Sequence, residues 1–275
     1  MKLIKSLLNK FWSLHRSVVL RNVKYRNIHN NQTCLIFGNG GSLKYHDFSA
    51  IKKIPAIGCS YSLADKRISK FGMDYCVIPD SYFFYYFRKH SYANRIIKNL
   101  IGPIVKKIIR QNKSTRFFTP LTNYYSLFCR SSDLSYFHHF GDKSSGSCNF
   151  AGNMSNCSGG LDIMISFAKY LGFSKAILLG CDYLGSPKLE GHFYSDSVPA
   201  YGNDDPQYVA RIKKVAGELD VLVILPKGSS CSAFKTATFE EHFGAAEVYQ
   251  SNTEIVDEEY LIMMRKATLN NQIWM

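Results

Sequence analysis

Short, continuously apolar runs alternate with helical patterns along most of this chain. The runs end in polar or glycine-rich tips and stand at 33–37, 55–58, 73–78, 175–179 and 221–225. Strands that are buried on both faces form unbroken apolar runs, as is typical of parallel strands covered by helices. Helices are expected at 161–171 and 206–218. The pattern predicts an α/β fold, with a mostly parallel sheet and helices on both faces.

The chain divides into a basic start and one large domain. With 275 residues, of which 46% are hydrophobic and 20% charged, it can bury one sizeable core. Residues 1–30 form a basic amphipathic N-terminal segment, and residues 31–275 form the α/β domain. Within this domain we expect a basic, aromatic insertion at about 81–150 and a small lid loop at about 184–205.

Positive charge is unevenly distributed along the sequence, whose formal net charge is +13. Residues 1–30 hold seven Lys or Arg and no acid, and residues 81–132 hold ten and no acid. Such segregation creates a directional field that attracts polyanions. Both segments also carry an apolar stripe at helical spacing. Each stripe either lies on an anionic membrane surface or packs on the domain, and the sequence leaves both interpretations open.

Several classes of protein do not fit the sequence. No run approaches the roughly 20 apolar residues that span a bilayer, and the first residues lack the pattern of a secretory signal. We therefore expect a cytoplasmic protein, with peripheral association at the inner membrane as a role for its basic segments. The eight cysteines form no Cys-x-x-Cys pair, which favours buried thiols over a zinc site or disulfides. The charge comes without a nucleic-acid-binding motif, so no nucleic-acid partner is expected. The oligomeric state stays open.

Polar residues follow the expected strands at the points where the strands end. Asn39, Ser60, Asp80 and Asp182 all stand at such carboxyl ends. In parallel α/β sheets, ligands bind beyond the carboxyl ends of the strands. These four residues therefore predict a binding site at one end of the sheet.

The strongest local motif is a glycine-rich loop between the first strand and a short helix. Glycines let backbone N–H groups approach a ligand, and the start of a helix favours phosphate. The spacing matches neither the dinucleotide fingerprint nor the P-loop. The loop predicts a nucleotide site without indicating a reaction, and its candidate residues are Gly38, Asn39, Gly40 and Ser42.

Two more motifs carry candidate residues. Asn156, Ser158 and Gly159 precede the helix expected at 161–171, and Ser158 serves there either as a helix N-cap or as a nucleotide contact. Farther along, residues 180–183 form the polar end of the strand expected at 175–179. His192 follows nine residues after Tyr183 and is preceded by a glycine.

The histidine lies in a polar loop, where a pKa near neutrality suits proton transfer. Neighbouring tyrosines, Tyr183 and Tyr194, can donate hydrogen bonds to a departing phosphate. A histidine in a loop is also compatible with no catalytic role at all.

Five segments, taken in order, resemble glycosyltransferase family 42, the bacterial sialyltransferases, and the related flagellin-glycosylation and DUF115 (MptE-like) proteins. They are LIFGNGGSLK at 35–44, SGG at 158–160, LGFSKAILLGCDY at 171–183, GH at 191–192 and VLVILPKGSS at 221–230. The resemblance covers roughly 33–235. It implies a Rossmann-like fold, as a GT-A-like single-domain variant with a small lid.

The resemblance also implies an activity. A sialyltransferase-like enzyme of this family transfers an acidic sugar from a CMP-activated donor to a cell-surface glycan or glycolipid, as in lipopolysaccharide or capsule biosynthesis. The transfer inverts the sugar and uses neither a metal nor a cofactor. Asn39 and Ser42 would contact the donor, and Ser158 and Gly159 would form a second nucleotide clamp. His192 would be the general base, and tyrosines would steady the leaving phosphate.

The sequence departs from the family pattern at three places. Ser155 stands where the family has an arginine, and Ser60 stands where an asparagine is usual. The tyrosine of the strand before the G-x-D tip is replaced by Ile177 or Leu178. The tyrosines left for that role are Tyr183, Tyr194 and Tyr201. These departures leave sialic, legionaminic and pseudaminic acid and Kdo open as the donor sugar.

Two other functions compete with sugar transfer. An MptE-like pterin diphosphokinase would need an acidic cluster for Mg²⁺, for which Asp182, Asp204 and Asp205 are the nearby candidates. A non-catalytic nucleotide or glycan binder would keep the fold and lack the chemistry.

Overall fold

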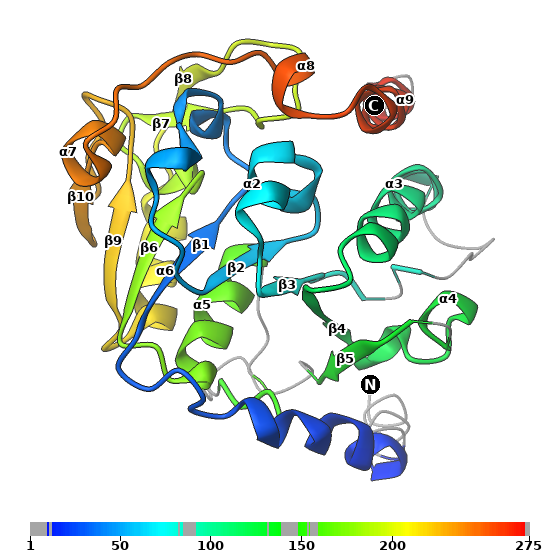
Figure 1. Ribbon diagram of the computed structural model, residues 1–275. Coiled ribbons are helices and arrows are strands. Elements are labelled where there is room, and N and C mark those ends of the chain that lie inside the picture. The colour runs from blue at the N-terminus through cyan, green and yellow to red at the C-terminus, as the bar shows by residue number, and fades with distance from the viewer. Residues whose placement is uncertain are drawn as a thin grey trace.

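An eight-stranded sheet runs through the described part of this computed structural model, which comprises residues 10, 13–81, 83–84, 92–130, 132–138, 148–152, 154 and 159–272 (Figure 1). The strand order is β10-β9-β6-β1-β2-β3-β4-β5, and every neighbouring pair is parallel. The strands are β1 (Thr33–Phe37), β2 (Ala56–Cys59), β3 (Tyr75–Val77), β4 (Arg116–Pro120), β5 (Leu134–Phe137), β6 (Lys175–Leu179), β9 (Asp220–Ile224) and β10 (Lys235–Ala237). The predicted α/β, Rossmann-like fold is confirmed.

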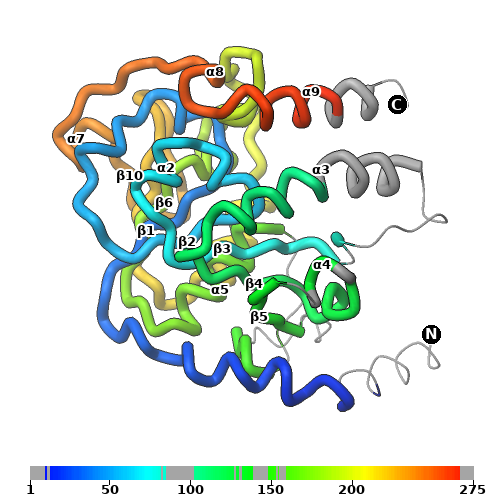
Figure 2. Tube along the Cα trace, turned by 45° about the vertical axis from the view of Figure 1, so that its right-hand side comes forward, coloured from blue at the N-terminus to red at the C-terminus, as the bar shows by residue number. Residues whose placement is uncertain are grey.

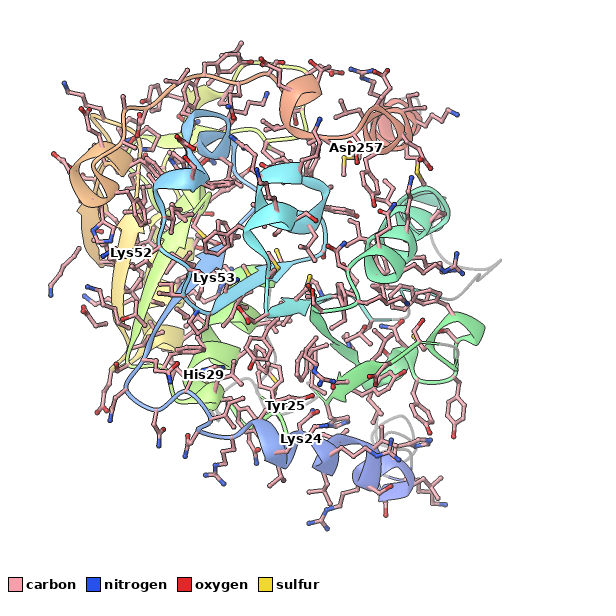
Figure 3. All side chains as sticks on the ribbon, viewed as in Figure 1. Lys24, Tyr25, His29, Lys52, Lys53 and Asp257 are labelled. Atoms are coloured by element: carbon pink, nitrogen blue, oxygen red, sulfur yellow. The ribbon has the colours of Figure 1, made fainter. Side chains whose placement is uncertain are left out.

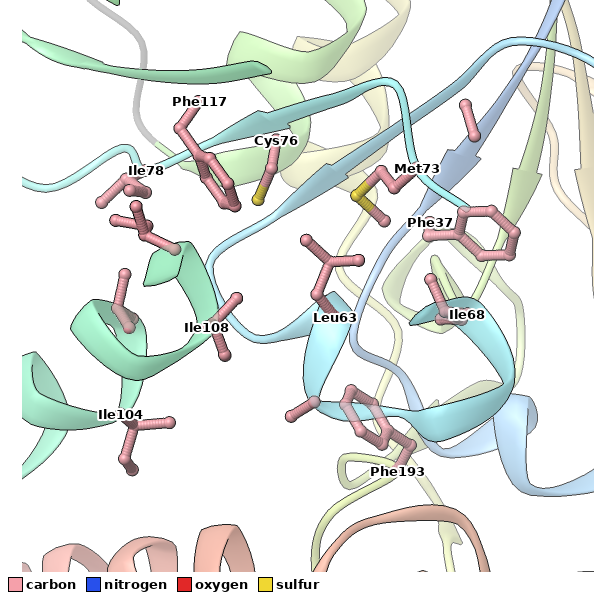
Figure 4. Packing of buried hydrophobic residues seen from close by; sticks show 14 of the residues in the cluster. Phe37, Leu63, Ile68, Met73, Cys76, Ile78, Ile104, Ile108, Phe117 and Phe193 are labelled. Carbon is pink, nitrogen blue, oxygen red and sulfur yellow. The ribbon is translucent and has the colours of Figure 1, made fainter. Parts of the chain in front are cut away.

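Helices cover both faces of the sheet, because successive side chains of a strand point to opposite faces. Along β1, Leu35 and Phe37 pack into one buried cluster with α2 and α3, whereas Cys34 and Ile36 join a second cluster with α5 and α6. Figure 4 shows part of the first cluster, in which Ile68 of α2 lies near side chains of the sheet. The helices are α2 (Lys66–Phe71), α3 (Tyr92–Gln111), α4 (Leu127–Arg130), α5 (Gly160–Leu171), α6 (Pro206–Ala216), α7 (Phe239–Phe243), α8 (Asn252–Ile255) and α9 (Glu258–Gln272).

The sheet has a switch point between β1 and β6. From β1 the chain proceeds outward through β2, β3, β4 and β5, and then returns to place β6 on the other side of β1. The loops that leave β1 and β6 therefore begin side by side and serve opposite halves of the sheet. Crevices at such points are the usual ligand sites of open α/β sheets.

The middle of the chain was expected to be an insertion, and this expectation is wrong. β4 and β5 extend the main sheet, so the described residues between about 81 and 150 complete one half of it. The apolar stripe of α3 packs on that half: Ile104, Val105 and Ile108 are all fully buried. Aromatic side chains of this region also belong to the core: Phe83, Phe84, Phe117 and Phe118 are all buried. Pro103 lies within α3 and does not end it.

The predicted boundary at residue 30 also needs correction. Residues 13–25 of the N-terminal segment are helical and lie against the domain. Val19 is fully buried, and Asn22 is 1% exposed. The Asn22 side chain donates to the backbone carbonyls of Tyr136 (2.7 Å) and Phe150 (2.9 Å). Val18, Val19 and Tyr25 are buried against the domain, whereas Leu14 is 78% exposed. This part of the segment is therefore packed on the domain along one side.

The expected lid loop is a short hairpin. Strands β7 (Lys188–Glu190) and β8 (Ala200–Gly202) pair in antiparallel fashion, with residues 191–199 between them. After the sheet, α8 leads into α9, which lies alongside α3, where Lys107 pairs with Glu259 (Figure 2). Among the described residues, none of the helices is both long and apolar enough to cross a membrane.

A buried histidine makes the stability of this fold depend on pH. His46 is 2% exposed and stacks on Phe239, with 4.5 Å between ring centroids. Burial, with a smaller contribution from the Arg67 charge, lowers the pKa of His46 from 6.5 to about 3. The unfolded chain therefore binds a proton near pH 6.5 that the folded protein does not bind, so stability falls as pH falls below 6.5.

We expect His46→Gln to remove this dependence. Between pH 7 and pH 5 the wild-type protein should lose about 2 kcal/mol more unfolding free energy than the variant. Urea unfolding of both proteins at the two pH values measures the difference. Burial raises the pKa of Asp182 to about 6, which acts in the opposite direction, but both proteins carry this group and its effect cancels. Equal pH slopes for the two proteins would contradict the assignment.

Candidate active site

A cavity of about 230 Å³ lies at the switch point of the sheet. Its walls come from the loops after β1 and β6, the end of β2, the start of α5, the β7–β8 hairpin and α6. The lining residues are Gly38, Asn39, Gly40, Cys59, Gly160, Leu161, Met164, Gly180, Cys181, Tyr183, His192 and Tyr208. Segments that are far apart in the sequence thus enclose one space beyond the carboxyl ends of the strands.

The glycine loop is held close to the tip of β6. The backbone N–H of Gly38 donates to Leu179 O, and that of Gly40 donates to Gly180 O, both at 2.8 Å. A Cβ atom at Gly38 would lie 2.1 Å from Gly180 O. Gly180 itself has a φ of +65°, in the left-handed region that favours glycine. These two tips approach so closely because neither carries a side chain.

Asn39 is fixed in the cavity wall through its side-chain amide. Its Oδ1 lies 3.1 Å from Ser62 Oγ, and its Nδ2 donates to Cys59 Sγ (3.6 Å). An amide nitrogen carries two hydrogens, so this arrangement leaves one donor for a ligand in the cavity. Asn39 is therefore preorganised as a polar contact.

Ser42 and Asp182 lie beneath the glycine loop and are bonded to each other. The Asp182 carboxylate accepts from the Ser42 backbone N–H at 2.8 Å and from Ser42 Oγ at 2.5 Å. Ser42 is 1% exposed and Asp182 is fully buried. Burial raises the pKa of Asp182 to about 6, while the bonds from Ser42 oppose this shift. In this structure the pair holds the loop in place and does not line the cavity.

His192 lines the cavity opposite the tips of the sheet. Its Nδ1 lies 3.2 Å from the backbone oxygen of Asn39, and the next N–H, that of Phe193, donates to the same oxygen at 3.2 Å. Gly40 and His192 also form an isolated antiparallel β-bridge, which joins the hairpin to the glycine loop. A carbonyl can only accept, so the contact requires the proton on Nδ1 and leaves the lone pair on Nε2.

The environment of the imidazole also favours its neutral form. The ring stacks on Tyr194, with 5.0 Å between centroids and 21° between ring planes. Burial lowers the pKa of His192, and the bond to Asn39 O partly offsets this effect. At neutral pH the ring is therefore ready to accept a proton at Nε2.

The start of α5 forms another wall of the cavity. Gly160, Leu161 and Met164 come from its first turns. Gly159 is the N-cap residue and offers no side-chain cap to the first N–H groups of the helix. Unpaired N–H groups at a helix start attract anions. The other predicted residues of this motif, Asn156 and Ser158, lie outside the described residues.

Besides Ser42, Asp182 and Gly159, three more predicted residues do not line the cavity. Ser60 is buried after β2, and its backbone N–H donates to Val77 O at 3.0 Å. Asp80 is exposed after β3. Tyr194 packs behind His192 as described above. The structure thus brings Gly38, Asn39, Gly40, Tyr183 and His192 together at the cavity wall, with Ser42, Asp182 and Tyr194 behind them.

Five side chains of the wall were not anticipated: Cys59, Leu161, Met164, Cys181 and Tyr208. Cys59 is the last residue of β2 and Cys181 is the second residue after β6, so both lie at the carboxyl ends of strands, as the predicted polar residues do. Burial raises the pKa of Cys59 to about 12, so its thiol is neutral at physiological pH. Met164 lies four residues after Gly160, on the same face of α5. Helical spacing identifies it once the start of α5 is placed at the site.

The acidic residues that a magnesium site would use have other partners. Asp182 is bonded to Ser42, Asp204 accepts from Ser186 Oγ at 2.5 Å, and Asp205 caps α6 by accepting from Tyr208 N at 2.9 Å. Within the part of the chain that the structure describes, no group of three His, Cys, Asp or Glu side chains is arranged to hold a metal ion.

Replacing Gly38 by alanine should disrupt the cavity. The new Cβ would meet the backbone of Gly180 at 2.1 Å, and backbone cannot move aside as a flexible side chain can. We expect a loss of about 1–3 kcal/mol of unfolding free energy, measured by urea unfolding. Gly102→Ala is the control, since its Cβ would meet its nearest neighbour, Phe83 O, at an ordinary 3.6 Å. Unchanged stability of the Gly38 variant would contradict this geometry.

Comparisons with known proteins give structural neighbours alone. The sequence matches no protein-family model and no curated protein. The chain is similar to the sialyltransferase CstII from Campylobacter jejuni in complex with cytidine-5'-monophosphate, at 14% identity and a TM-score of 0.44, over 86% of this chain and 99% of that chain. It is similar to CstII in complex with CMP-3FNeuAc at 15% identity and a TM-score of 0.45, with the same coverage. A likeness this distant assigns neither a substrate nor residue roles to this chain.

Proposed function

We propose that this protein is a glycosyltransferase that transfers an acidic sugar from a CMP-activated donor to a glycan or glycolipid acceptor. One observation carries the proposal. A single cavity is lined by the glycine loop, by the start of α5 and by His192, whose Nδ1 faces the Asn39 carbonyl, so that Nε2 is the basic nitrogen. The sequence resemblance to glycosyltransferase family 42 supplies the class of reaction.

The anion-binding wall suits the phosphate of the donor. The glycine loop lets its backbone approach closely, and the first N–H groups of α5 favour negative charge. Asn39 contributes the free hydrogen of its amide. In the transition state, negative charge grows on the phosphate oxygen that leaves the sugar, and fixed donors of this kind stabilise such charge. Tyr183 also lines the cavity and can donate from its hydroxyl group.

His192 would act as the general base. Its Nε2 takes the proton from the acceptor hydroxyl as that oxygen attacks the anomeric carbon of the sugar. The new carbon–oxygen bond forms while the bond from carbon to the phosphate oxygen breaks, and CMP leaves with the electron pair. The proton later passes from His192 to solvent. A single displacement of this kind inverts the anomeric carbon.

The acceptor and the place of action are further parts of the proposal. The net charge of +13 and its concentration in acid-free segments favour acceptors that are anionic or displayed at an anionic membrane surface. We propose a cytoplasmic enzyme that acts at the inner face of the membrane in the assembly of lipopolysaccharide or capsule.

The decisive assay uses CMP-activated sugars in EDTA. We expect release of CMP from one of the CMP-sialic acid, CMP-legionaminic acid, CMP-pseudaminic acid or CMP-Kdo donors, with faster release when a glycan acceptor is added. Consumption of ATP that depends strictly on Mg²⁺ would instead identify a diphosphokinase. Binding of CMP without turnover of any donor would identify a non-catalytic binder.

A further inference from the structure

Lys44 is a buried cation next to the glycine loop. It lies on the short 3-10 helix η2 (Gly41–Tyr45), two residues after Ser42, and is 0% exposed. The residue does not line the cavity. Burying an ammonium group is costly unless hydrogen bonds replace its water. The partners of Lys44 therefore indicate what the fold gains from placing it there.

Both hydrogen-bond partners of the Lys44 ammonium group belong to the loop that carries His192. Its Nζ donates to Ser195 O at 2.7 Å and to Ser197 O at 3.0 Å. The first of these carbonyls is three residues from His192, and the backbone N–H of Ser195 in turn donates to His192 O at 3.0 Å. A short, continuous chain of hydrogen bonds thus joins Lys44 to the backbone of His192.

The other side of the same loop is held by the C-terminal helices. Asn252 of α8 donates through Nδ2 to Tyr194 O at 3.1 Å and to Asp196 Oδ1 at 2.9 Å. Arg265 of α9 donates to the Asp196 carboxylate, with its shortest contact at 2.8 Å. The negative charge of Asp196 also stabilises the charged form of Lys44. Burial lowers the pKa of Lys44, and the Asp196 charge opposes that shift.

This arrangement connects the two walls of the cavity. η2 holds Ser42, which is bonded to Asp182 beneath the glycine loop, and the same short helix holds Lys44. The glycine loop already contacts His192 and Phe193 through Asn39 O, and Lys44 adds a second connection, through a buried side chain, to the residues that follow His192. For a proton transfer, a fixed position matters because small displacements are costly.

We propose that Lys44 is a positioning residue that fixes the orientation of His192 by holding the loop of residues 195–197. The inference rests on the proposed function for the role of His192 as a base. It does not depend on that function for the geometry, because the orientation of the imidazole can be observed without any substrate.

The test uses the full chain with ¹⁵N-labelled histidine and the variant Lys44→Met, which keeps the length of the side chain and removes its hydrogen-bond donors. In the wild-type protein, imidazole ¹⁵N spectra should show His192 with its proton on Nδ1. In Lys44→Met, we expect a mixture of the two tautomers, because the bond from Nδ1 to Asn39 O is no longer enforced. His192→Gln assigns the signals.

Two further variants keep the test decisive. Asn252→Ala removes the bond to Tyr194 O from the opposite side and should shift the same signals, even if Lys44→Met folds poorly. Lys169→Met is the matched control: its Nζ donates to Val215 O at 2.7 Å, between α5 and α6, and the loss should leave the His192 signals unchanged. In transfer assays, Lys44→Met should lower kcat by about 100-fold with little change in KM for the donor.

The outcomes separate this inference from the proposed function. Unchanged His192 signals in folded Lys44→Met and Asn252→Ala would overturn the positioning role, whatever the enzyme does. Shifted signals in a protein that turns over no donor would leave the positioning role intact and would refute the transferase.

Discussion

Replacing His192 by alanine is expected to lower the rate of sugar transfer by about 100-fold to 10,000-fold, the range of a lost general base. The affinity for CMP should stay nearly unchanged, because the glycine loop and the start of α5 remain in place. The two effects are expected to differ because the imidazole contacts the glycine loop at the backbone oxygen of Asn39. Replacing His192 by alanine removes the imidazole and leaves the residues of the glycine loop unchanged. Transfer kinetics and calorimetric titration with CMP measure the two quantities.

The matched control for this prediction is His242→Ala. His242 belongs to α7, away from the cavity, and packs edge-on against Phe243. Its loss should leave both transfer and CMP binding unchanged. If His192→Ala lost CMP affinity and transfer by the same factor, the imidazole would be a binding group, and its role as base would be rejected.

Replacing Arg67 by methionine is expected to cost about 3–5 kcal/mol of unfolding free energy. The Arg67 guanidinium donates to both oxygens of Asp65, at 2.6 and 3.0 Å, and the Asp65 side chain is fully buried. It also donates to the carbonyls of Leu43 (2.8 Å) and His46 (3.0 Å), which belong to the helix after the glycine loop and to its cap. Removal of the arginine leaves a buried carboxylate without its counter-charge.

An exposed ion pair provides the control for this stability measurement. Lys53, labelled in Figure 3, lies 3.7 Å from Asp74, and the two side chains are 54% and 43% exposed. Lys53→Met should cost at most about 1 kcal/mol, because water screens the pair. Urea unfolding of both variants gives the comparison. A cost for Arg67→Met no larger than that for Lys53→Met would show that the buried pair adds no stability.

Much of the fold follows from local sequence patterns. The apolar runs at 33–37 and 175–179 predicted β1 and β6 to the residue, because strands buried on both faces leave a continuous signal. The helix expected at 161–171 is α5, which begins at Gly160. The middle of the chain was predicted to be an insertion because its strands, such as β4, are rich in aromatic and basic residues. Strands of this composition nevertheless join the main sheet, at the end that β5 closes. A pattern cannot show which sheet a strand joins.

The position of the candidate cavity could be predicted from the sequence, whereas the residues that line it could be predicted only in part. Polar tips at the ends of the strands located it, since parallel strands end together. Whether a tip faces the cavity or supports it depends on tertiary packing. Asp182 and Ser42 resemble ligand contacts in sequence, yet they are satisfied by each other. Cys59 resembles a buried structural thiol, yet it forms part of the wall.

The proposed function requires the cavity at the switch point to bind a cytidine phosphate. Its most direct test is a panel of CMP, UDP, GDP and ATP, each added at a high excess in EDTA, with unfolding free energy as the readout. A ligand at 100 times its dissociation constant adds about 2.7 kcal/mol. We expect CMP to stabilise the wild-type protein by this amount and the Gly38→Ala variant by much less. No stabilisation by CMP, or stabilisation by ATP alone once Mg²⁺ is supplied, would show that the cavity is not a cytidine phosphate site.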